Sequence, residues 1–197
     1  MLKVVCPIKE IAKLPSAESA PAGNDNVQNV PRGFDWRDDE PASLVYAMPL
    51  DSGFIKKQVE FHDAVYSLSA PFNQEAKELF KTKTRFAGVI WGNTKVALVT
   101  EVLRGKQTSK VSRYSPADGT MEVLYERNLT DAYKNPGSPV LTKNALGREV
   151  IQFTDNGSKI LMNNPVGSSD QGDLPFISKF DLATKKNEII WRAKPGY

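Results

Sequence analysis

The sequence has a single cysteine, Cys6, among its 197 residues. One thiol excludes an internal disulfide framework and a cysteine-rich zinc site, because both need several cysteines from the same chain. Cys6 stands directly before Pro7, with no second cysteine and no evident activating cluster of charges. We therefore interpret Cys6 as an unreactive thiol.

Long apolar runs are also missing. No stretch approaches the roughly 18 consecutive apolar residues of a membrane-spanning helix. Near the N-terminus, charged residues interrupt the apolar core that a secretory signal peptide needs, namely Lys3, Lys9, Glu10 and Lys13. We expect no membrane partner, and the sequence leaves the compartment open.

A strong excess of one charge is absent as well. The net charge is +3 with both signs interspersed, which is too little to indicate a nucleic-acid partner. The densest basic stretch contains Arg104, Lys106, Lys110 and Arg113, with Tyr114 beside it. Such a stretch could grip phosphates, but its aromatic residue follows strand periodicity rather than forming a stacking platform. We interpret it as a solvent-exposed hairpin and expect no nucleic-acid partner.

Catalytic patterns are sparse. The nucleophile elbow of an α/β-hydrolase, Gly-x-Ser-x-Gly, does not occur. The segment 137–139 lacks the second glycine, and 167–172 has the wrong spacing, so both read as turns. His62 is the only histidine and no activated nucleophile accompanies it, so we interpret it as a surface or inter-unit residue. We assign no catalytic residue, and whether the chain is an enzyme stays open at this point.

The densest carboxylates are Asp35, Asp38, Asp39 and Glu40. They lack the alternating spacing and central glycine of a calcium loop. We interpret them as a solvated loop that caps or salt-bridges neighbouring units. No metal-binding or cofactor-binding residue is predicted, and the substrate-binding residues stay unknown.

A repeated hairpin pattern is the clearest feature that the sequence does contain. Residues 114–125 read as a strand, an Asp118-Gly119 turn and a second strand. The same order of residue classes returns at 180–191, and a looser copy runs from Tyr66 to Phe80. Self-similarity of this size indicates a repeat architecture. All-β repeats closed by outer hairpins are typical of β-propeller blades, each a four-stranded antiparallel sheet.

We therefore predict an all-β fold, a partial β-propeller of about three four-stranded antiparallel blades plus a stray N-terminal strand at 2–6. Only 74–80 has any helical character. The domain boundaries follow from these units: 1–31 as the end of a preceding blade and a long loop, 32–85, 86–131 and 132–193 as blades, and 194–197 as a linker. Closed propellers typically use four to eight blades, and exposed sheet edges are avoided. We expect a segment of a longer chain, the alternative being closure by self-association.

A family resemblance extends from Val30 to Tyr197. It is carried chiefly by residues 31–42, 70–72, 85–92, 97–101, 127–140, 172–176 and 180–184. These segments resemble the glutamyl endopeptidases of the prolyl oligopeptidase (S9) serine peptidase family, in the later part of their N-terminal β-propeller.

The resemblance implies a propeller followed by a C-terminal α/β-hydrolase domain that cleaves peptides after glutamate. Because only the later propeller is matched, it implies a non-catalytic segment that gates the access of peptides to a catalytic domain missing from this chain. The implied partners are that hydrolase domain and its peptide substrates, which basic residues facing the central cavity would attract. The implied compartment is periplasmic or organellar. The alternative is a stand-alone propeller-like module that binds proteins or ligands.

Overall fold

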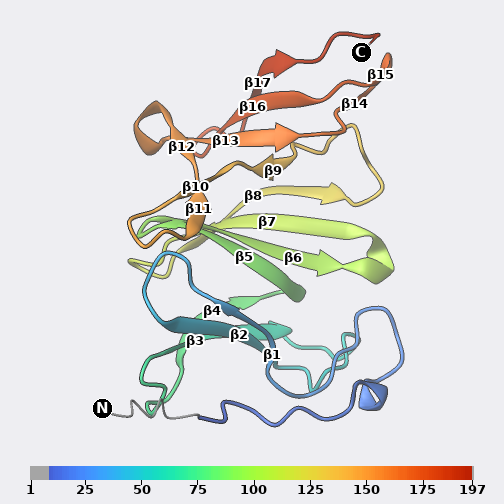
Figure 1. Ribbon diagram of the computed structural model, residues 1–197. Coiled ribbons are helices and arrows are strands. Elements are labelled where there is room, and N and C mark those ends of the chain that lie inside the picture. Colours follow the sequence, from blue (N-terminus) through green and yellow to red (C-terminus); the bar gives the residue numbers. More distant parts are fainter. Residues whose placement is uncertain (1–8, 197) are drawn as a thin grey trace, which may run out of the picture.

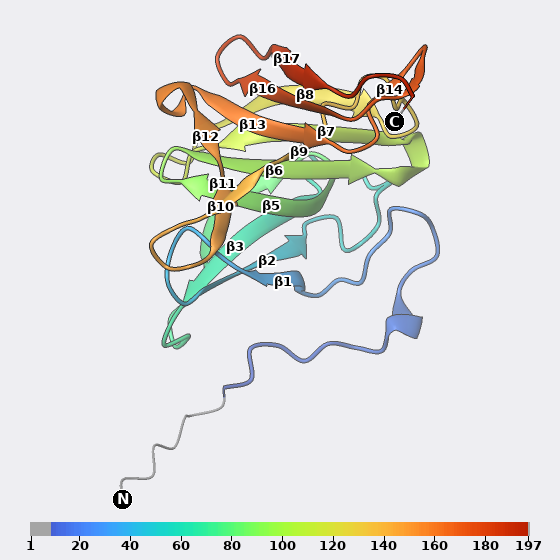
Figure 2. The ribbon, with the colours of Figure 1, turned by 45° about the horizontal axis from the view of Figure 1, so that its top comes forward.

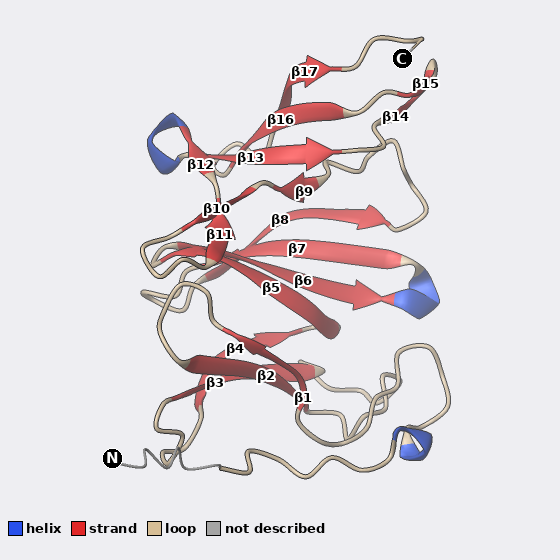
Figure 3. Cartoon of the chain, in the orientation of Figure 1, coloured by secondary structure: helices blue, strands red, loops and turns tan. Residues whose placement is uncertain are grey.

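The computed structural model describes residues 9–196, and almost all of its regular structure is β-strand (Figures 1 and 3). The described part has three short 3-10 turns, η1 (Ala17–Ser19), η2 (Arg104–Lys106) and η3 (Asp155–Gly157). Within that part, no helix has the length and apolar character needed to span a bilayer. The predicted strand at 2–6, together with Cys6, lies outside the described residues. The predicted all-β class is confirmed.

The first sheet has four antiparallel strands in sequence order, β1 (Arg32–Trp36), β2 (Ser43–Pro49), β3 (Asp63–Ser69) and β4 (Lys77–Thr82). Alternate residues of β2 are buried, as expected for a strand that buries one face more deeply than the other. The helical character expected for 74–80 is wrong, because Lys77 begins β4. Pairing with β3 outweighs the weak local preference for helix.

The second sheet repeats this plan, and the third extends it. The second consists of β5 (Arg85–Asn93), β6 (Val96–Leu103), β7 (Thr108–Tyr114) and β8 (Met121–Asn128). The third has β12 (Phe153–Thr154), β13 (Lys159–Asn164), β16 (Phe176–Asp181) and β17 (Asn187–Arg192), with β9 (Ser138–Pro139) also paired to β13. Two small ribbons complete the fold, β10 (Leu141–Lys143) with β11 (Glu149–Ile151), and β14 (Ser168–Ser169) with β15 (Gly172–Asp173).

The three sheets are stacked in chain order, as Figures 1 and 2 show from two directions. Each sheet is a small antiparallel meander, so the arrangement is that of successive blades of a partial β-propeller. The predicted fold class is confirmed. The proposed division into domains at 31, 85, 131 and 193 stays a prediction.

The repeated hairpins occupy equivalent places in the sheets. The copies found at 114 and 180 lie on β7–β8 and β16–β17, and the looser copy lies on β3–β4. Each is the last pair of strands in its sheet. Each pair also breaks register once, at Val65/Tyr66, at Val111/Ser112 and at Ile177/Ser178. A bulge increases the local twist, so the repeat includes the backbone irregularity as well as the residue classes.

Two apolar cores hold the stack together. The first joins the first and second sheets and contains Val45, Ala47, Val65, Phe80, Trp91, Ala97, Val99 and Tyr114. The second joins the second and third sheets and contains Val96, Leu98, Val111, Leu124, Ile151, Ile160, Met162, Phe180 and Leu182. Successive residues of β6 alternate between the two cores, because neighbouring side chains of a strand point to opposite faces. The second sheet is therefore buried on both faces.

Candidate binding cleft between the first two sheets

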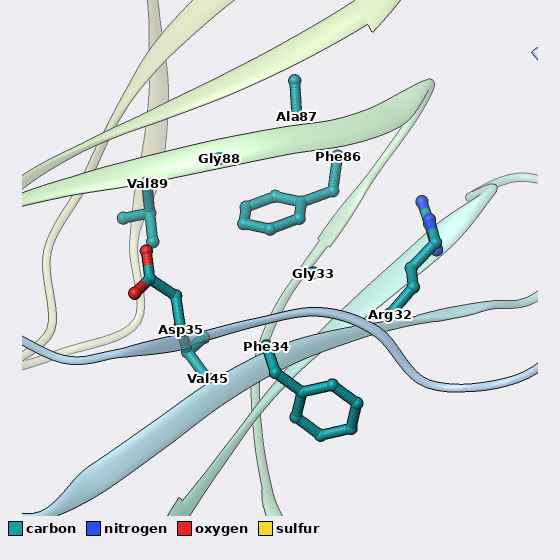
Figure 4. Close-up of a pocket in the computed structure, with 9 residues that line it drawn as sticks. All are labelled: Arg32, Gly33, Phe34, Asp35, Val45, Phe86, Ala87, Gly88 and Val89. Atoms are coloured by element: carbon teal, nitrogen blue, oxygen red, sulfur yellow. The ribbon is translucent and has the colours of Figure 1, made fainter. Parts of the chain in front are cut away.

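A cleft of about 300 Å³ lies between β1 and β5, the first strands of the first two sheets (Figure 4). Its lining comprises Arg32, Gly33, Phe34, Asp35, Val45, Phe86, Ala87, Gly88 and Val89. In Figure 4 the carboxylate of Asp35 points toward Val89, and Arg32 lies at the other end of the labelled group. The ring of Phe34 points away from β5 and packs against Tyr46. The cleft thus combines the aromatic side chain of Phe86 with one cation and one carboxylate.

Both strands of the cleft break their regular pairing next to a glycine. The register of β1 against β2 shifts between Arg32 and Asp35, around Gly33, and that of β5 against β6 shifts between Phe86 and Gly88. Gly33 has φ +63°, in the left-handed region that glycine adopts without steric cost. A Cβ added at Gly33 or at Gly88 would meet nothing within 4 Å. The two irregularities therefore leave open space along the cleft.

Arg32 connects the cleft with the interior. Its Nη2 donates a hydrogen bond to Oδ2 of the fully buried Asp63. Its Nη1 is buried and has no hydrogen-bond partner among the described residues. A buried donor without an acceptor is costly, so this end of the Arg32 guanidinium carries an unmet hydrogen bond.

Behind Arg32, a buried ion cluster joins the first two sheets. The guanidinium of Arg85 donates from Nη2 to Oδ2 of Asp51 at 2.7 Å and from Nη1 to Oδ1 of Asp63 at 3.0 Å. Its Nε donates to the carbonyl oxygen of Asp25 at 2.7 Å. Asp51 and Asp63 are each 0% exposed. Buried charges need such close pairing, because each would otherwise carry an uncompensated desolvation cost.

His62 belongs to the same cluster. Its Nδ1 lies 2.8 Å from Oδ2 of Asp51. Burial alone would raise the pKa of Asp51, but hydrogen bonds from Arg85 and His62 lower the pKa below its ordinary value. Asp51 is therefore a carboxylate near neutral pH and accepts the Nδ1–H of the ring, which leaves Nε2 as the remaining polar atom of the imidazole. His62 thus lies between the first two sheets, held by a carboxylate.

The acidic tract reaches the cleft only through Asp35, and its other carboxylates lie outside the cleft lining. Arg37 pairs with Asp39 at 2.7 Å and also with Glu40, and its guanidinium lies 4.3 Å from the ring centroid of Trp91. Arg148, which directly precedes β11, donates to the backbone oxygens of Arg37 and Glu40. The tract therefore connects the first sheet with the β10–β11 ribbon.

The carboxylates of this tract do not gather at one point. Asp38 has a raised pKa because of burial and the nearby charge of Asp35. Across residues 9–196 no group of three or more His, Cys, Asp or Glu side chains is arranged to hold a metal ion.

The basic stretch of the second sheet does not form one surface. Lys110 pairs with the buried Glu101 at 2.9 Å, and Arg113 pairs with Glu122 at 2.8 Å. Arg104 and Lys106 lie in η2, at the turn between β6 and β7.

The serines and His62 occupy different parts of the fold. Ser138 lies in β9, and Ser168 and Ser169 lie in β14, both in the region of the third sheet. His62 lies at the junction of the first two sheets.

Sequence reasoning missed the acids and the arginine of the ion cluster. Asp63 and Arg85 each open a strand, and Asp51 and Asp25 lie in loops. The signal in the sequence was that Asp63 and Arg85 are charged residues at the first positions of largely apolar strands. This signal could not identify Asp51 and Asp25 as the partners of Arg85, because both lie in distant loops.

Comparison with known proteins relates the chain to part of a larger one. No protein-family model matches it. A probable chloroplastic glutamyl endopeptidase of Oryza sativa subsp. japonica is 35% identical over 193 residues, and one of Arabidopsis thaliana is 31% identical over 194 residues. Both matches cover 94% of this chain and 20% of the relative, so the chain spans about one fifth of the length of these curated relatives.

Among solved structures, TolB from Acinetobacter baumannii aligns with a TM-score of 0.43 and 14% identity, over 78% of this chain and 31% of that chain. The resemblance to glutamyl endopeptidases found in the sequence is confirmed by the curated relatives.

Proposed function

We propose that this chain is part of the propeller of a serine peptidase of the glutamyl endopeptidase type, where it restricts the access of peptides to a separate catalytic domain. The observation that carries the proposal is the match to two probable glutamyl endopeptidases over 94% of the chain. The match covers only 20% of each relative, which leaves ample length for a domain that performs the chemistry.

The residues of the chain support a role in enclosing an active site rather than in forming its catalytic centre. Acyl transfer by a serine peptidase needs a nucleophile, a general base within hydrogen-bond reach and an oxyanion site. The sequence has no Gly-x-Ser-x-Gly and one histidine, and Nδ1 of that histidine is engaged by Asp51. Of the serines considered above, Ser138 lies in the third sheet and Ser168 and Ser169 lie in the β14–β15 ribbon, away from His62 in the fold. The peptidase chemistry therefore belongs to another domain in this proposal.

The cleft between β1 and β5 supports a role in peptide access. The aromatic side chain of Phe86 suits apolar parts of a peptide, and Arg32 suits a carboxylate. In a propeller the first strand of each blade faces the central channel. A peptide passing along the channel would meet this cleft.

A covalent probe tests where the chemistry resides. The 197-residue chain and the product of the complete reading frame are treated with a fluorophosphonate, and labelled serines are located by mass spectrometry. We expect no label within 1–197 and one labelled serine elsewhere in the complete product. A labelled serine within 1–197 would contradict the proposal, and a reading frame without Gly-x-Ser-x-Gly would favour a stand-alone binding module.

A substitution in the cleft tests the access role in the complete peptidase. Asp35 is exposed in β1 and points across the cleft toward Val89, so Asp35→Trp narrows it. Asp170→Trp is the matched control, because Asp170 is exposed between β14 and β15, outside the cleft lining. We expect Asp35→Trp alone to lower kcat/KM for long peptides more than for a short fluorogenic one. Equal kcat/KM values for all three proteins would contradict a gating role.

A further inference from the structure

A second cavity, of about 480 Å³, lies at one end of the first two sheets. Three connections surround it: the loop before β3, the β4–β5 connection and the η2 turn between β6 and β7. The pairings Asp63↔Thr82 and Arg85↔Val102 place all three at the same end of their sheets. Its lining comprises Asp25, Ile55, Lys56, His62, Lys83, Thr84, Leu103, Gly105 and Lys106.

The charge of this cavity is unbalanced. Each of the three connections contributes one lysine, namely Lys56, Lys83 and Lys106. None of the three has a carboxylate within 4.0 Å in the described part of the chain, where the ion-paired lysines are Lys13, Lys81, Lys110, Lys134, Lys159, Lys179 and Lys185. Like charges around one cavity raise the local potential, and a bound anion relieves it.

The one carboxylate of the lining does not relieve this excess by contact. Both oxygens of Asp25 accept backbone hydrogen bonds, Oδ1 from the N–H of Arg104 at 2.7 Å and Oδ2 from the N–H of Gly105 at 2.8 Å. Asp25 thereby fixes the turn that carries Lys106.

His62 adds a polar atom to the cavity. Its Nδ1 is engaged by Asp51, and its backbone N–H and carbonyl bond to Thr82 and Leu50. Nε2 is the polar atom of His62 that has no partner among residues 9–196. Because Asp51 fixes the ring, the position of Nε2 is fixed as well.

We propose that this cavity binds a phosphorylated small molecule. The three lysines of the lining hold the phosphate group, because a multiply charged anion with several acceptor oxygens matches several cations around one cavity. The organic part lies over Ile55 and Leu103, the apolar residues of the lining. A volume of about 480 Å³ falls in the range of small-molecule sites and exceeds what a single phosphate needs. This ligand site is separate from the peptide cleft and does not depend on the proposed function.

Calorimetry at fixed ionic strength tests the proposal with three probes on the 197-residue chain: phenyl phosphate, phenol and inorganic phosphate. We expect phenyl phosphate to bind most tightly, inorganic phosphate more weakly, and phenol not at all. Equal affinity for phenyl phosphate and inorganic phosphate would assign the site to free phosphate instead. Absence of binding by both phosphates, or equal binding of phenol, would overturn the proposal.

Charge-removing variants locate the site. Lys83→Gln and Lys106→Gln should each raise the Kd for phenyl phosphate by about three- to ten-fold, the effect of losing one charged hydrogen bond. Lys95→Gln is the matched control, because Lys95 is exposed and lies in the turn between β5 and β6, outside the cavity lining. An equal loss of affinity in Lys95→Gln would show general attraction to a basic surface and would overturn the assignment.

Discussion

The junction between the first and second sheets and the junction between the second and third are built differently. The first combines an apolar core with the buried charges of Asp51, Asp63 and Arg85. The second has an apolar core of nine buried residues. An ion pair that connects the second sheet with the third, Lys185 with Glu122 at 2.9 Å, has both side chains substantially exposed. Two similar sheet packings therefore rest on different balances of forces.

This difference determines which junction has the more strictly defined packing geometry. An apolar core tolerates changes of shape as long as its volume is filled, whereas a buried ion cluster is stable only when every charge finds its partner. The first junction is consequently the one with a strictly defined geometry. Both cavities described above also adjoin it, through Arg32 in one case and His62 in the other. The buried charges and the two candidate binding sites therefore lie at the same junction.

Removal of the Arg85 charge should have the largest effect at the first junction. Arg85→Leu leaves Asp51 and Asp63 buried without their main partner, so we expect the free energy of unfolding to fall by about 3–5 kcal/mol. Urea denaturation measures this, with Arg104→Leu as the control, because Arg104 is exposed and its side chain has no partner in the described part of the chain. A loss below about 1 kcal/mol, the range of surface pairs, would mean that the cluster is not decisive.

A cavity-creating substitution tests the apolar junction between the second and third sheets. Ile160 is 1% exposed in the second core, and Ile160→Ala should lower the free energy of unfolding by about 2–4 kcal/mol. Because no charge is altered, the loss should be the same in low and high salt, as measured by urea denaturation at two sodium chloride concentrations. A loss that changes strongly with salt would contradict the apolar account of this junction.

Low pH should weaken the first junction specifically, because that junction contains the buried carboxylate of Asp51. The pKa of Asp51 in the folded protein lies below its ordinary value near 3.8, so its stabilising contribution is fully present above that value. It is lost as the pH falls through the lowered pKa of the folded state. We expect the stability gap between the natural chain and Asp51→Asn to narrow as the pH falls below about pH 4. A gap that stays constant down to pH 2 would contradict this.

The smallest effect is expected at the surface of the second junction. Glu122 has a lowered pKa because of its hydrogen bond with Lys185, but the pair is open to solvent. Glu122→Gln should leave the thermal unfolding midpoint unchanged within error, because solvent screens exposed pairs. A clear drop in the midpoint would show that charge matters at the second junction as well.

The repeat pattern in the sequence was enough to predict the class of fold. Turn residues and two-fold alternation identified the hairpins that became β7–β8 and β16–β17, because both signals are local. The helical character of 74–80 was wrong, since pairing with a neighbouring strand decided that segment.

The cleft and the ion cluster were beyond prediction for a different reason. Arg85 meets Asp51 and Asp63 from 34 and 22 residues away, and no local pattern encodes which distant loop supplies a partner. The register shifts near Gly33 and Gly88 that open the cleft are likewise set by pairing between strands.

Hydrogen exchange followed by mass spectrometry at pH 7 and pH 3 compares the two junctions most directly. Protection factors are calculated for amides of β2 and β3, which pack against the charged junction, and of β13 and β16, which pack against the apolar one. We predict that the change from pH 7 to pH 3 lowers the protection factors of β2 and β3 more than those of β13 and β16. Equal losses in both pairs of strands, or a larger loss in β13 and β16, would contradict the claim that different forces hold the two junctions.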